Sequence, residues 1–230
     1  MAGVSSRRKG ETLIRDGRIS VNGVTVTDPA YRINVDNDTV AFDGKTLTVN
    51  SGRRYIVMNK PTGVIVSCGD THGRATVFDL LGRGMESVFP VGRLDADTLG
   101  VLLMTDDGDL AYRLTHPSFG VEKVYRAEVS GRVTEEDIVA LAVGIELDDG
   151  PAAPAQMTII DSGENVSLVT VIMHQGRKRQ VRRMLEKIGH PVRVLERISF
   201  GGITAENLPL GSYRMLTPEE IERVKKKVAK

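Results

Sequence analysis

The 230-residue sequence has one cysteine, no tryptophan and only 4% aromatic residues. A single cysteine excludes a disulfide scaffold and any cysteine-rich zinc or iron–sulfur site, and it fits a reducing compartment. No apolar run approaches the roughly 18 residues that a membrane span needs. The N-terminus, MAGVSSRRKGETL, is charged and lacks the apolar core of a secretory signal. We therefore expect a cytoplasmic protein without a membrane segment.

The sequence also has almost no net charge, because 31 Lys and Arg residues face 30 Asp and Glu residues. The charges are nevertheless separated along the chain. Residues 1–23 carry five basic side chains against two acids, residues 174–197 carry eight against two, and residues 131–168 carry one against eight. Basic surfaces most often bind the phosphate of a nucleic acid or a small ligand, although solvated helix faces give the same counts. The hydrophobic share of 40% excludes a disordered chain.

A small N-terminal domain is predicted over residues 1–48. Ser5-Ser6 can cap a helix from Arg7 to Asp16. Asn22-Gly23, between alternating residues, predicts a β-hairpin. So few apolar residues bury little surface, and a polar linker at 50–54 leads to a larger second domain.

The second domain, predicted over residues 53–230, is rich in strands. Strands are expected at 55–58, 64–67, 101–105, 124–129, 156–160, 166–173 and 192–198, and helices at 77–81, 109–115, 135–143, 178–188 and 219–228. Thr134 with Asp137, and Thr217 with Glu220, predict two capped helix starts. The connections lack regular βαβ alternation, which predicts an α+β fold with a mixed, mainly antiparallel sheet and flanking helices.

The most informative segment is Gly92-Arg93-Leu94-Asp95-Ala96-Asp97-Thr98-Leu99-Gly100, just ahead of a buried strand. Loops held by a sheet often carry reactive groups, but these acids are also common turn formers. The segment resembles the catalytic loop of pseudouridine synthases of the RsuA/RluB type, which isomerise uridine in ribosomal RNA. Residues 59–63, 123–125 and 176–184 resemble three further motifs of that family, in the family's order.

This resemblance implies the pseudouridine synthase catalytic fold and a set of catalytic residues. Asp95 matches the carboxylate that acts on the ribose or the base, and Arg182 matches the arginine that pairs with it. A cationic partner keeps a buried Asp ionised, and a bidentate Arg positions it. Tyr125 matches the tyrosine that lies against the flipped-out base, where its hydroxyl can help to remove the C5 proton. The chemistry needs no metal and no cofactor, and we expect neither.

The resemblance also implies RNA contacts by basic side chains. They are expected at Arg93, Lys60, Lys123, Arg177, Arg179, Arg183, Arg7 and Arg8. In the helix expected at 178–188, Arg179, Arg183 and Lys187 lie four residues apart and are predicted to face solvent or RNA. Arg182 lies beside the apolar stripe and is predicted to turn toward Asp95.

Residues 1–48 resemble the S4-like RNA-binding module of the same family. The family has a helix ahead of the segment that matches Ser6-Arg7-Arg8, so we expect a truncated module. Ribosomal RNA is the expected partner, of the large subunit by preference and of the small subunit as a possibility, and a monomer is the expected state. The sequence does not define the modified uridine.

Two other functions stay open on the sequence alone. One is a non-catalytic RNA-binding protein that retains the synthase fold. The other is a hydrolase that uses Asp95 and Asp97 as paired acids on a glycosidic bond. The presence of Asp95, Tyr125 and Arg182 together argues against the first, and the basic segments suit RNA better than a neutral sugar. The four histidines are scattered and show no metal-ligand spacing.

Overall fold

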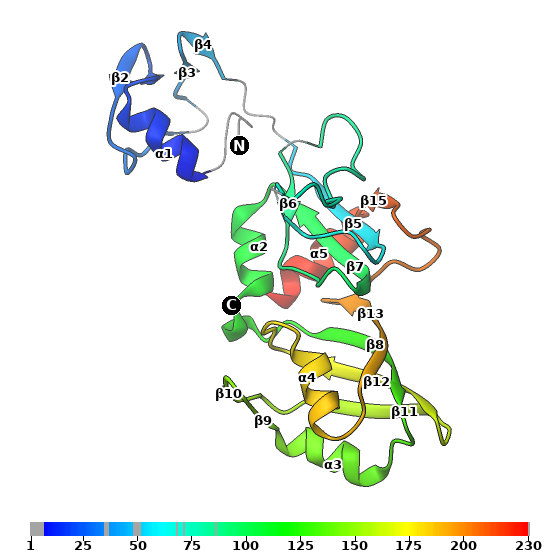
Figure 1. The fold of residues 1–230 in the computed structure, drawn as a ribbon. Helices are drawn as coiled ribbons and strands as arrows, with labels where there is room; N and C mark the ends of the chain where they lie inside the picture. The colour runs from blue at the N-terminus through cyan, green and yellow to red at the C-terminus, as the bar shows by residue number, and fades with distance from the viewer. Residues whose placement is uncertain are drawn as a thin grey trace. The chain divides into compact units, whose positions relative to one another are not determined.

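A computed structural model describes residues 7–34, 37–47, 52–67, 69–70, 72–85 and 87–229. Two compact units make up the chain (Figure 1). The N-terminal unit comprises residues 1–53 with 84–87, and the C-terminal unit comprises residues 54–83 with 88–230. The predicted helix cap at Ser5-Ser6, the side chain of Arg7 and Cys68 lie outside the described residues.

The described part of the N-terminal unit contains one helix and a small antiparallel sheet. Its elements are α1 (Arg7–Arg15), β1 (Ile19–Val21), β2 (Val24–Val26), β3 (Val40–Phe42) and β4 (Lys45–Thr46), with the sheet order β2-β1-β3-β4. Asn22 and Gly23 have φ values of 51° and 82°, as the two central residues of a type I′ turn require. The predicted hairpin is therefore confirmed, and its register places Val21 opposite Val24.

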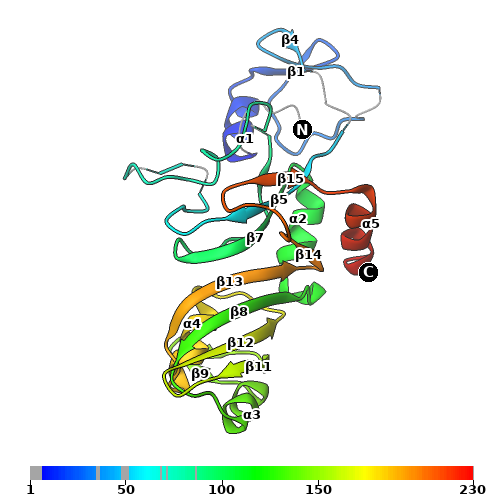
Figure 2. The ribbon, with the colours of Figure 1, turned by 90° about the vertical axis from the view of Figure 1, so that its right-hand side faces the viewer.

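One mixed sheet of nine strands is the main element of the described part of the C-terminal unit. The strands are β5 (Tyr55–Lys60), β6 (Phe89–Pro90), β7 (Thr98–Thr105), β8 (Lys123–Ser130), β11 (Gln156–Ser162), β12 (Val166–Met173), β13 (Val192–Phe200), β14 (Ile203–Thr204) and β15 (Tyr213–Met215). Figure 2 shows the main order, β11-β12-β8-β13-β7-β5-β15. Strand β13 pairs with β7 in parallel, whereas the other named strand pairs of the described chain are antiparallel. The predicted α+β class is confirmed.

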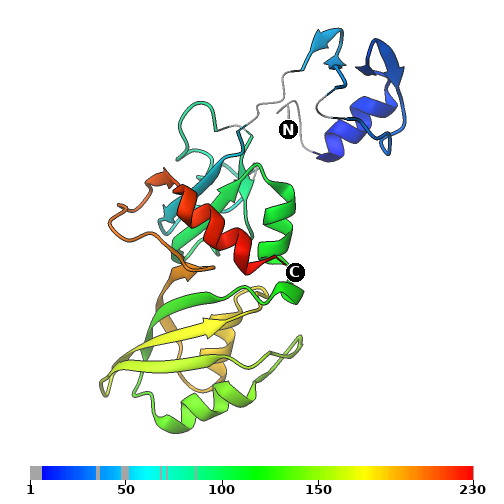
Figure 3. The same cartoon turned by 180° about the vertical axis from the view of Figure 1, so that it is seen from behind.

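Helices cover the sheet and complete its core. They are α2 (Gly108–Thr115), η1 (Pro117–Phe119), α3 (Glu135–Val143), α4 (Gln180–Lys187) and α5 (Pro218–Lys227), and a short hairpin β9 (Glu146–Leu147) and β10 (Gly150–Pro151) follows α3. Figure 3 shows α2 and α5 beside the β5–β7 half of the sheet. Apolar residues of these two helices, such as Leu110, Leu114 and Val224, pack in one buried cluster with Val57 and Leu103. Helix α4 packs on β13 and β9, and α3 packs on β11.

The lack of a side chain at Gly100 allows strands β7 and β13 to lie close enough to pair. Its φ is 98°, and a Cβ at this position would lie 2.3 Å from the carbonyl oxygen of Arg197. A side chain is therefore excluded both by backbone conformation and by space. The parallel register sets Leu195 opposite Thr98 and Arg197 opposite Gly100.

The caps of α3 and α5 and the long strands agree with the sequence-based predictions. Two short elements, predicted at 64–67 and 77–81, do not. Capping boxes start α3 at Thr134 and α5 at Thr217. The helix predicted at 77–81 is a run of turns, begun by a bond from the Thr76 amide to the Asp79 carboxylate. The strand predicted at 64–67 is reduced to one isolated bridge between Ile65 and Thr76. None of the helices in the described ranges is long and apolar enough to cross a membrane.

Candidate active site

The loop that carries Asp95 joins β6 to β7, and its backbone is fixed by a buried lysine. The Lys60 ammonium donates to the carbonyl oxygens of Pro61, Ala96 and Thr98 at 2.8, 3.3 and 3.0 Å. The Gly63 amide donates to the Ala96 carbonyl at 2.8 Å. The loop is thus bound to the end of β5 immediately after Asp95.

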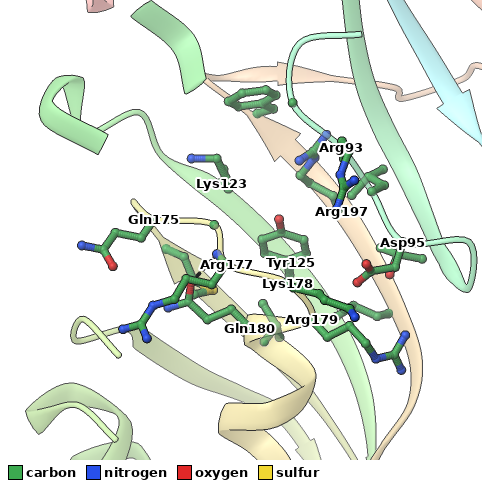
Figure 4. Close-up of a pocket in the computed structure, with 18 of the residues that line it drawn as sticks. Arg93, Asp95, Lys123, Tyr125, Gln175, Arg177, Lys178, Arg179, Gln180 and Arg197 are labelled. Carbon is green, nitrogen blue, oxygen red and sulfur yellow. Dashed lines mark hydrogen bonds between the residues drawn. The ribbon is translucent and has the colours of Figure 1, made fainter. Parts of the chain in front are cut away.

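Asp95 stands at the edge of a pocket of about 320 Å³ that opens to solvent. The pocket is lined by the 91–95 loop, by β8 and β13, and by the segment 175–181 that leads into α4. Figure 4 shows the Tyr125 ring in the middle of the pocket, with Asp95 on one side and Gln175 and Arg177 on the other. A carboxylate and an aromatic ring therefore share one cavity, as the sequence motifs imply.

Tyr125 reaches the pocket because successive side chains of β8 point to opposite faces of the sheet. Lys123, Tyr125 and Ala127 lie on the buried face of the strand, whereas Arg126 is exposed. Tyr125 is 9% exposed, and Arg197 of β13 lies directly opposite it in the sheet. Within the described residues the Tyr125 hydroxyl makes no hydrogen bond and the Asp95 carboxylate makes no ion pair, although the charges of Lys60 and Arg182 act on Asp95.

Arg182 contacts Asp97 directly, and within the described residues it forms no ion pair with Asp95, although the Asp95 charge also acts on it. Its Nη2 donates to the Asp97 carbonyl oxygen at 2.8 Å and lies 3.3 Å from Asp97 Oδ2, and its Nη1 donates to the Val192 carbonyl oxygen at 3.1 Å. A turn closed by the Thr98 amide on the Asp95 carbonyl, at 3.1 Å, separates the two carboxylates. Asp95 therefore lines the pocket while Asp97 meets the α4 arginine. Burial lowers the pKa of the Arg182 guanidinium, and the Asp97 charge opposes this.

Lys60 and Lys123 are buried, so neither is placed for a phosphate contact on the surface. Lys60 is 0% exposed, and Lys123 is 8% exposed and donates to the carbonyl oxygens of Val121 and His174 at 3.2 and 3.3 Å. Burial lowers the pKa of each ammonium to about 8, although the Asp97 and Asp95 charges oppose this at Lys60. Both lysines are mainly protonated at neutral pH, but neither ammonium can reach a phosphate outside the protein.

Comparisons with known proteins place the chain in a family. The family model described as RNA pseudouridylate synthase matches residues 54–187, and the S4 domain model matches residues 1–40. The chain belongs to the RNA pseudouridylate synthase family. Such an enzyme is an isomerase. The synthase is 41% identical, over 99% of its length and 90% of the relative, to an uncharacterised RNA pseudouridine synthase of Mycobacterium leprae.

Two further relatives cover nearly the whole synthase. One is the ribosomal large subunit pseudouridine synthase B of Bacillus subtilis, 38% identical over 97% of this chain and 92% of the relative. The other is a crystal structure of a pseudouridylate synthase, with a TM-score of 0.71 and 32% identity over 95% of this chain and 94% of that one. The fold of the synthase, and not only its motifs, is therefore that of the family.

Several arginines of the basic segment 177–183 form ion pairs with acids of the synthase itself. Arg183 donates to both carboxylate oxygens of Asp149 at 2.7 and 3.2 Å, and Arg177 donates to Asp149 Oδ1 at 3.2 Å and to the Pro151 carbonyl. Arg179 donates to both oxygens of Asp97 at 3.0 Å. Arg179 is exposed and Arg183 is half-buried, and each already has a carboxylate partner, so contact with RNA stays a prediction for both.

Other predicted RNA contacts remain available on the surface. Arg93 is exposed, lines the pocket beside Asp95 and also borders a second open cavity formed with residues 65–74. In the part of the chain that the structure describes, it makes no ion pair. Arg8 is exposed on α1 of the N-terminal unit. Helix α4 begins at Gln180 instead of 178, because Arg179 adopts a left-handed φ of 50°.

The sequence reasoning missed Arg197, which lines the pocket and is 2% exposed. Its Nε donates to the Val101 carbonyl oxygen at 2.8 Å, and its guanidinium lies 4.7 Å from the centroid of the Phe200 ring. A signal was present in the sequence, because Arg197 lies two residues after Leu195 and therefore on the same face of the strand. A basic residue in phase with the buried face marks a site.

Proposed function

We propose that this synthase isomerises a uridine of ribosomal RNA to pseudouridine, with Asp95 as the reacting carboxylate. The observation that carries the proposal is the half-buried Asp95 side chain on a pocket whose wall is Tyr125, with no ion pair to Asp95 within the described residues. The reaction breaks the bond from C1′ to N1, turns the base and forms a bond from C1′ to C5. The C5 proton leaves and N1 gains one, so no other reactant is needed.

The geometry supports a distinct role for each predicted residue. Tyr125 offers a ring on which a flipped-out base can stack and a hydroxyl close to its edge. Arg182 acts as a positioning residue, because it ties Asp97 to Val192 and so fixes the loop next to Asp95. Asp97 is engaged by two arginines, which disfavours a hydrolase that would need it as a second acid.

Ribosomal RNA of the large subunit is the proposed substrate. The name of the Bacillus subtilis relative supports this choice. The N-terminal unit matches the S4 domain model, and we propose that it binds the RNA through basic residues of α1 such as Arg8. The enzyme would then act as a monomer in the cytoplasm, where this RNA is its partner.

Tritium release from C5-labelled uridine tests the proposed function directly. The full chain is incubated with large- or small-subunit ribosomal RNA transcripts, and released tritium is counted. We expect release from the large-subunit transcript together with pseudouridine in the recovered RNA. A non-catalytic RNA binder would bind the transcript without release, and a glycosidic hydrolase would leave free uracil and an abasic site. Either of those two outcomes would overturn the proposal.

Replacing Tyr125 by Phe should slow the chemistry and leave RNA binding nearly unchanged. The ring still stacks on the base, which is worth roughly 1–3 kcal/mol, and only the hydroxyl is lost. A lost proton-transfer group costs about 10² to 10⁴-fold in rate. Single-turnover formation of pseudouridine at saturating RNA measures this effect, and a filter-binding titration checks the affinity. An unchanged rate would show that Tyr125 serves as a stacking platform only.

Replacing Asp149 by Asn should strengthen RNA binding. Asp149 sits in the β9–β10 turn and pairs with Arg177 and Arg183, and the Arg183 hydrogen bond holds the pKa of this carboxyl below its usual range. A phosphate that binds these arginines must displace it. The variant should bind ribosomal RNA about threefold to tenfold more tightly at low salt, with a steeper salt dependence worth about one phosphate contact.

Asp148→Asn is the matched control for that experiment. It removes the same charge from the neighbouring exposed position and leaves both ion pairs of Asp149 intact. Thermal stability should change little in either variant, because exposed pairs contribute about 0–1 kcal/mol. Equal gains in affinity for the two variants would mean that net charge alone, and not release of the arginines, explains the result.

A further inference from the structure

The far end of the pocket holds two buried cations without a carboxylate. Lys123 and Arg197 flank the Tyr125 ring on the side of its hydroxyl in Figure 4. They are 8% and 2% exposed, and both cations lie over the ring of Phe200, at 5.4 and 4.7 Å from its centroid. Among the described residues no acidic side chain forms an ion pair with either of them. Buried charges are costly unless they are paired.

One donor of Arg197 has no acceptor. Its Nε bonds the Val101 carbonyl oxygen, but its Nη2 is buried and has no hydrogen-bond partner in the described structure. A buried donor left unpaired costs about 1–3 kcal/mol, more for a charged group. Lys123 uses two backbone carbonyls, whereas an ammonium carries three donors. Both side chains line the pocket, which therefore holds two positive charges whose hydrogen-bonding capacity the protein does not fully use.

The position of these donors distinguishes a base from a phosphate. Arg197 lies directly opposite Tyr125 in the sheet, so a base stacked on that ring brings its edge to the guanidinium. A phosphodiester belongs to the RNA backbone, which stays near the mouth of the pocket when a nucleotide is flipped in. Uracil carries two carbonyl oxygens, O2 and O4, on either side of N3. Both are acceptors that suit two neighbouring donors.

We propose that Arg197, together with Lys123, binds the carbonyl edge of the flipped-out uracil and stabilises negative charge on its oxygens. The inference rests on the proposed isomerisation of uridine. When the bond from C1′ to N1 breaks, its electron pair stays with the base and spreads onto O2 and O4. Fixed donors aimed at such charge in a pocket shielded from water are worth most in the transition state. Protonated Lys123 supplies the second positive charge, since its pKa of about 8 lies above neutrality.

The test combines changes in the enzyme with changes in single atoms of the RNA. The uridine that the parent modifies is first mapped, and transcripts are then made with 2-thiouridine or 4-thiouridine at that position. We expect Arg197→Gln to lower the single-turnover rate at saturating RNA by about 10²-fold. One of the two thio-substituted transcripts should be slow with the parent. With the Arg197→Gln variant, the same thio-substituted transcript should react as fast as the uridine transcript, because the contact between residue 197 and the base is already lost.

Controls keep folding and function separate. Arg126→Gln is the matched control. Arg126 is next to Tyr125 in the strand, lies on the opposite face of the sheet and forms an ion pair with Glu196 at 2.7 Å. The reaction rate and the thio effects of this variant should equal those of the parent. Thermal unfolding checks each variant. If Arg197→Gln does not fold, Arg197→Lys retains the charge with fewer donors and should show the same reduced thio effect.

Three outcomes would overturn the proposal. Thio effects as large in the Arg197 variant as in the parent would show that the guanidinium does not contact the base. The slower rate of the Arg197 variant could instead disappear when the phosphate beside the modified uridine is replaced by an uncharged methylphosphonate, and persist when the uracil oxygens are replaced by sulfur. That result would assign Arg197 to a phosphate. A parent that forms no pseudouridine in any ribosomal RNA would remove the proposed function itself, and this result is distinguishable from the first two.

Discussion

Asp95→Asn is expected to abolish pseudouridine formation, by more than about 10³-fold, while the protein stays folded and binds RNA normally. Asn has nearly the same shape as Asp but cannot act as an anionic nucleophile or base. The loop should keep its conformation, because it is held through the backbone carbonyls of Ala96 and Thr98 and not through the Asp95 side chain. RNA affinity should persist, since phosphate contacts dominate it.

Single-turnover conversion and the melting temperature together measure this effect. Asp97→Asn is the comparison, because it changes the other carboxylate of the same loop. That variant should keep measurable activity, since Asp97 holds arginines and does not line the pocket. Activity of Asp95→Asn within about tenfold of the parent would contradict the role assigned to Asp95.

Arg182→Gln is expected to slow the saturated reaction by about 10²-fold, because a displacement near 1 Å of a reacting group has such a cost. The guanidinium is 10% exposed and joins Asp97 to Val192, so its removal leaves the loop free to shift relative to β13. RNA affinity should be close to normal, since a buried arginine is not available to phosphate.

Arg179→Gln is the matched control for Arg182→Gln. Arg179 pairs with the same Asp97 carboxylate, but its side chain is 42% exposed. An exposed pair contributes little, so the rate should stay within about threefold of the parent. An equal loss of rate in the two variants would show that a positive charge near Asp97 is needed and that the burial of Arg182 is not. A loss of RNA affinity in Arg182→Gln, with normal saturated turnover, would make Arg182 a phosphate contact.

Much of the fold follows from local patterns in the sequence. The long strands and the α3 and α5 caps are set by alternation and by cap residues within a few positions, so they could be predicted. The helix at 77–81 could not be excluded locally, because its apolar residues have no clear period and Asp79 is drawn into a turn with Thr76. The start of α4 was also misplaced, since the left-handed conformation of Arg179 depends on tertiary contacts such as its pair with Asp97.

The site could be located from motifs, but its partners could not. Asp95 and Tyr125 were expected in one pocket through the resemblance, and the structure brings them there. Which carboxylate meets Arg182 depends on a turn of the 95–98 backbone, which spacing alone does not specify. The pairs of Asp149 join segments that are far apart in sequence, and such pairings leave no local pattern. The burial of Lys60 and Lys123 could not be predicted, because a charged residue type says nothing of its depth.

The parallel pairing of β7 with β13 has a consequence for when activity arises. It joins segments about a hundred residues apart, and pairings at such separation form slowly because a long loop must close first. Leu195 and Arg197 reach the pocket on β13, which pairs with β8 on one side and with β7 on the other, and the absence of a side chain at Gly100 permits the second pairing. Asp95 and Tyr125 are synthesised before β13. The pocket is therefore incomplete until β13 has inserted between β7 and β8. Catalytic competence is thus a late event in folding.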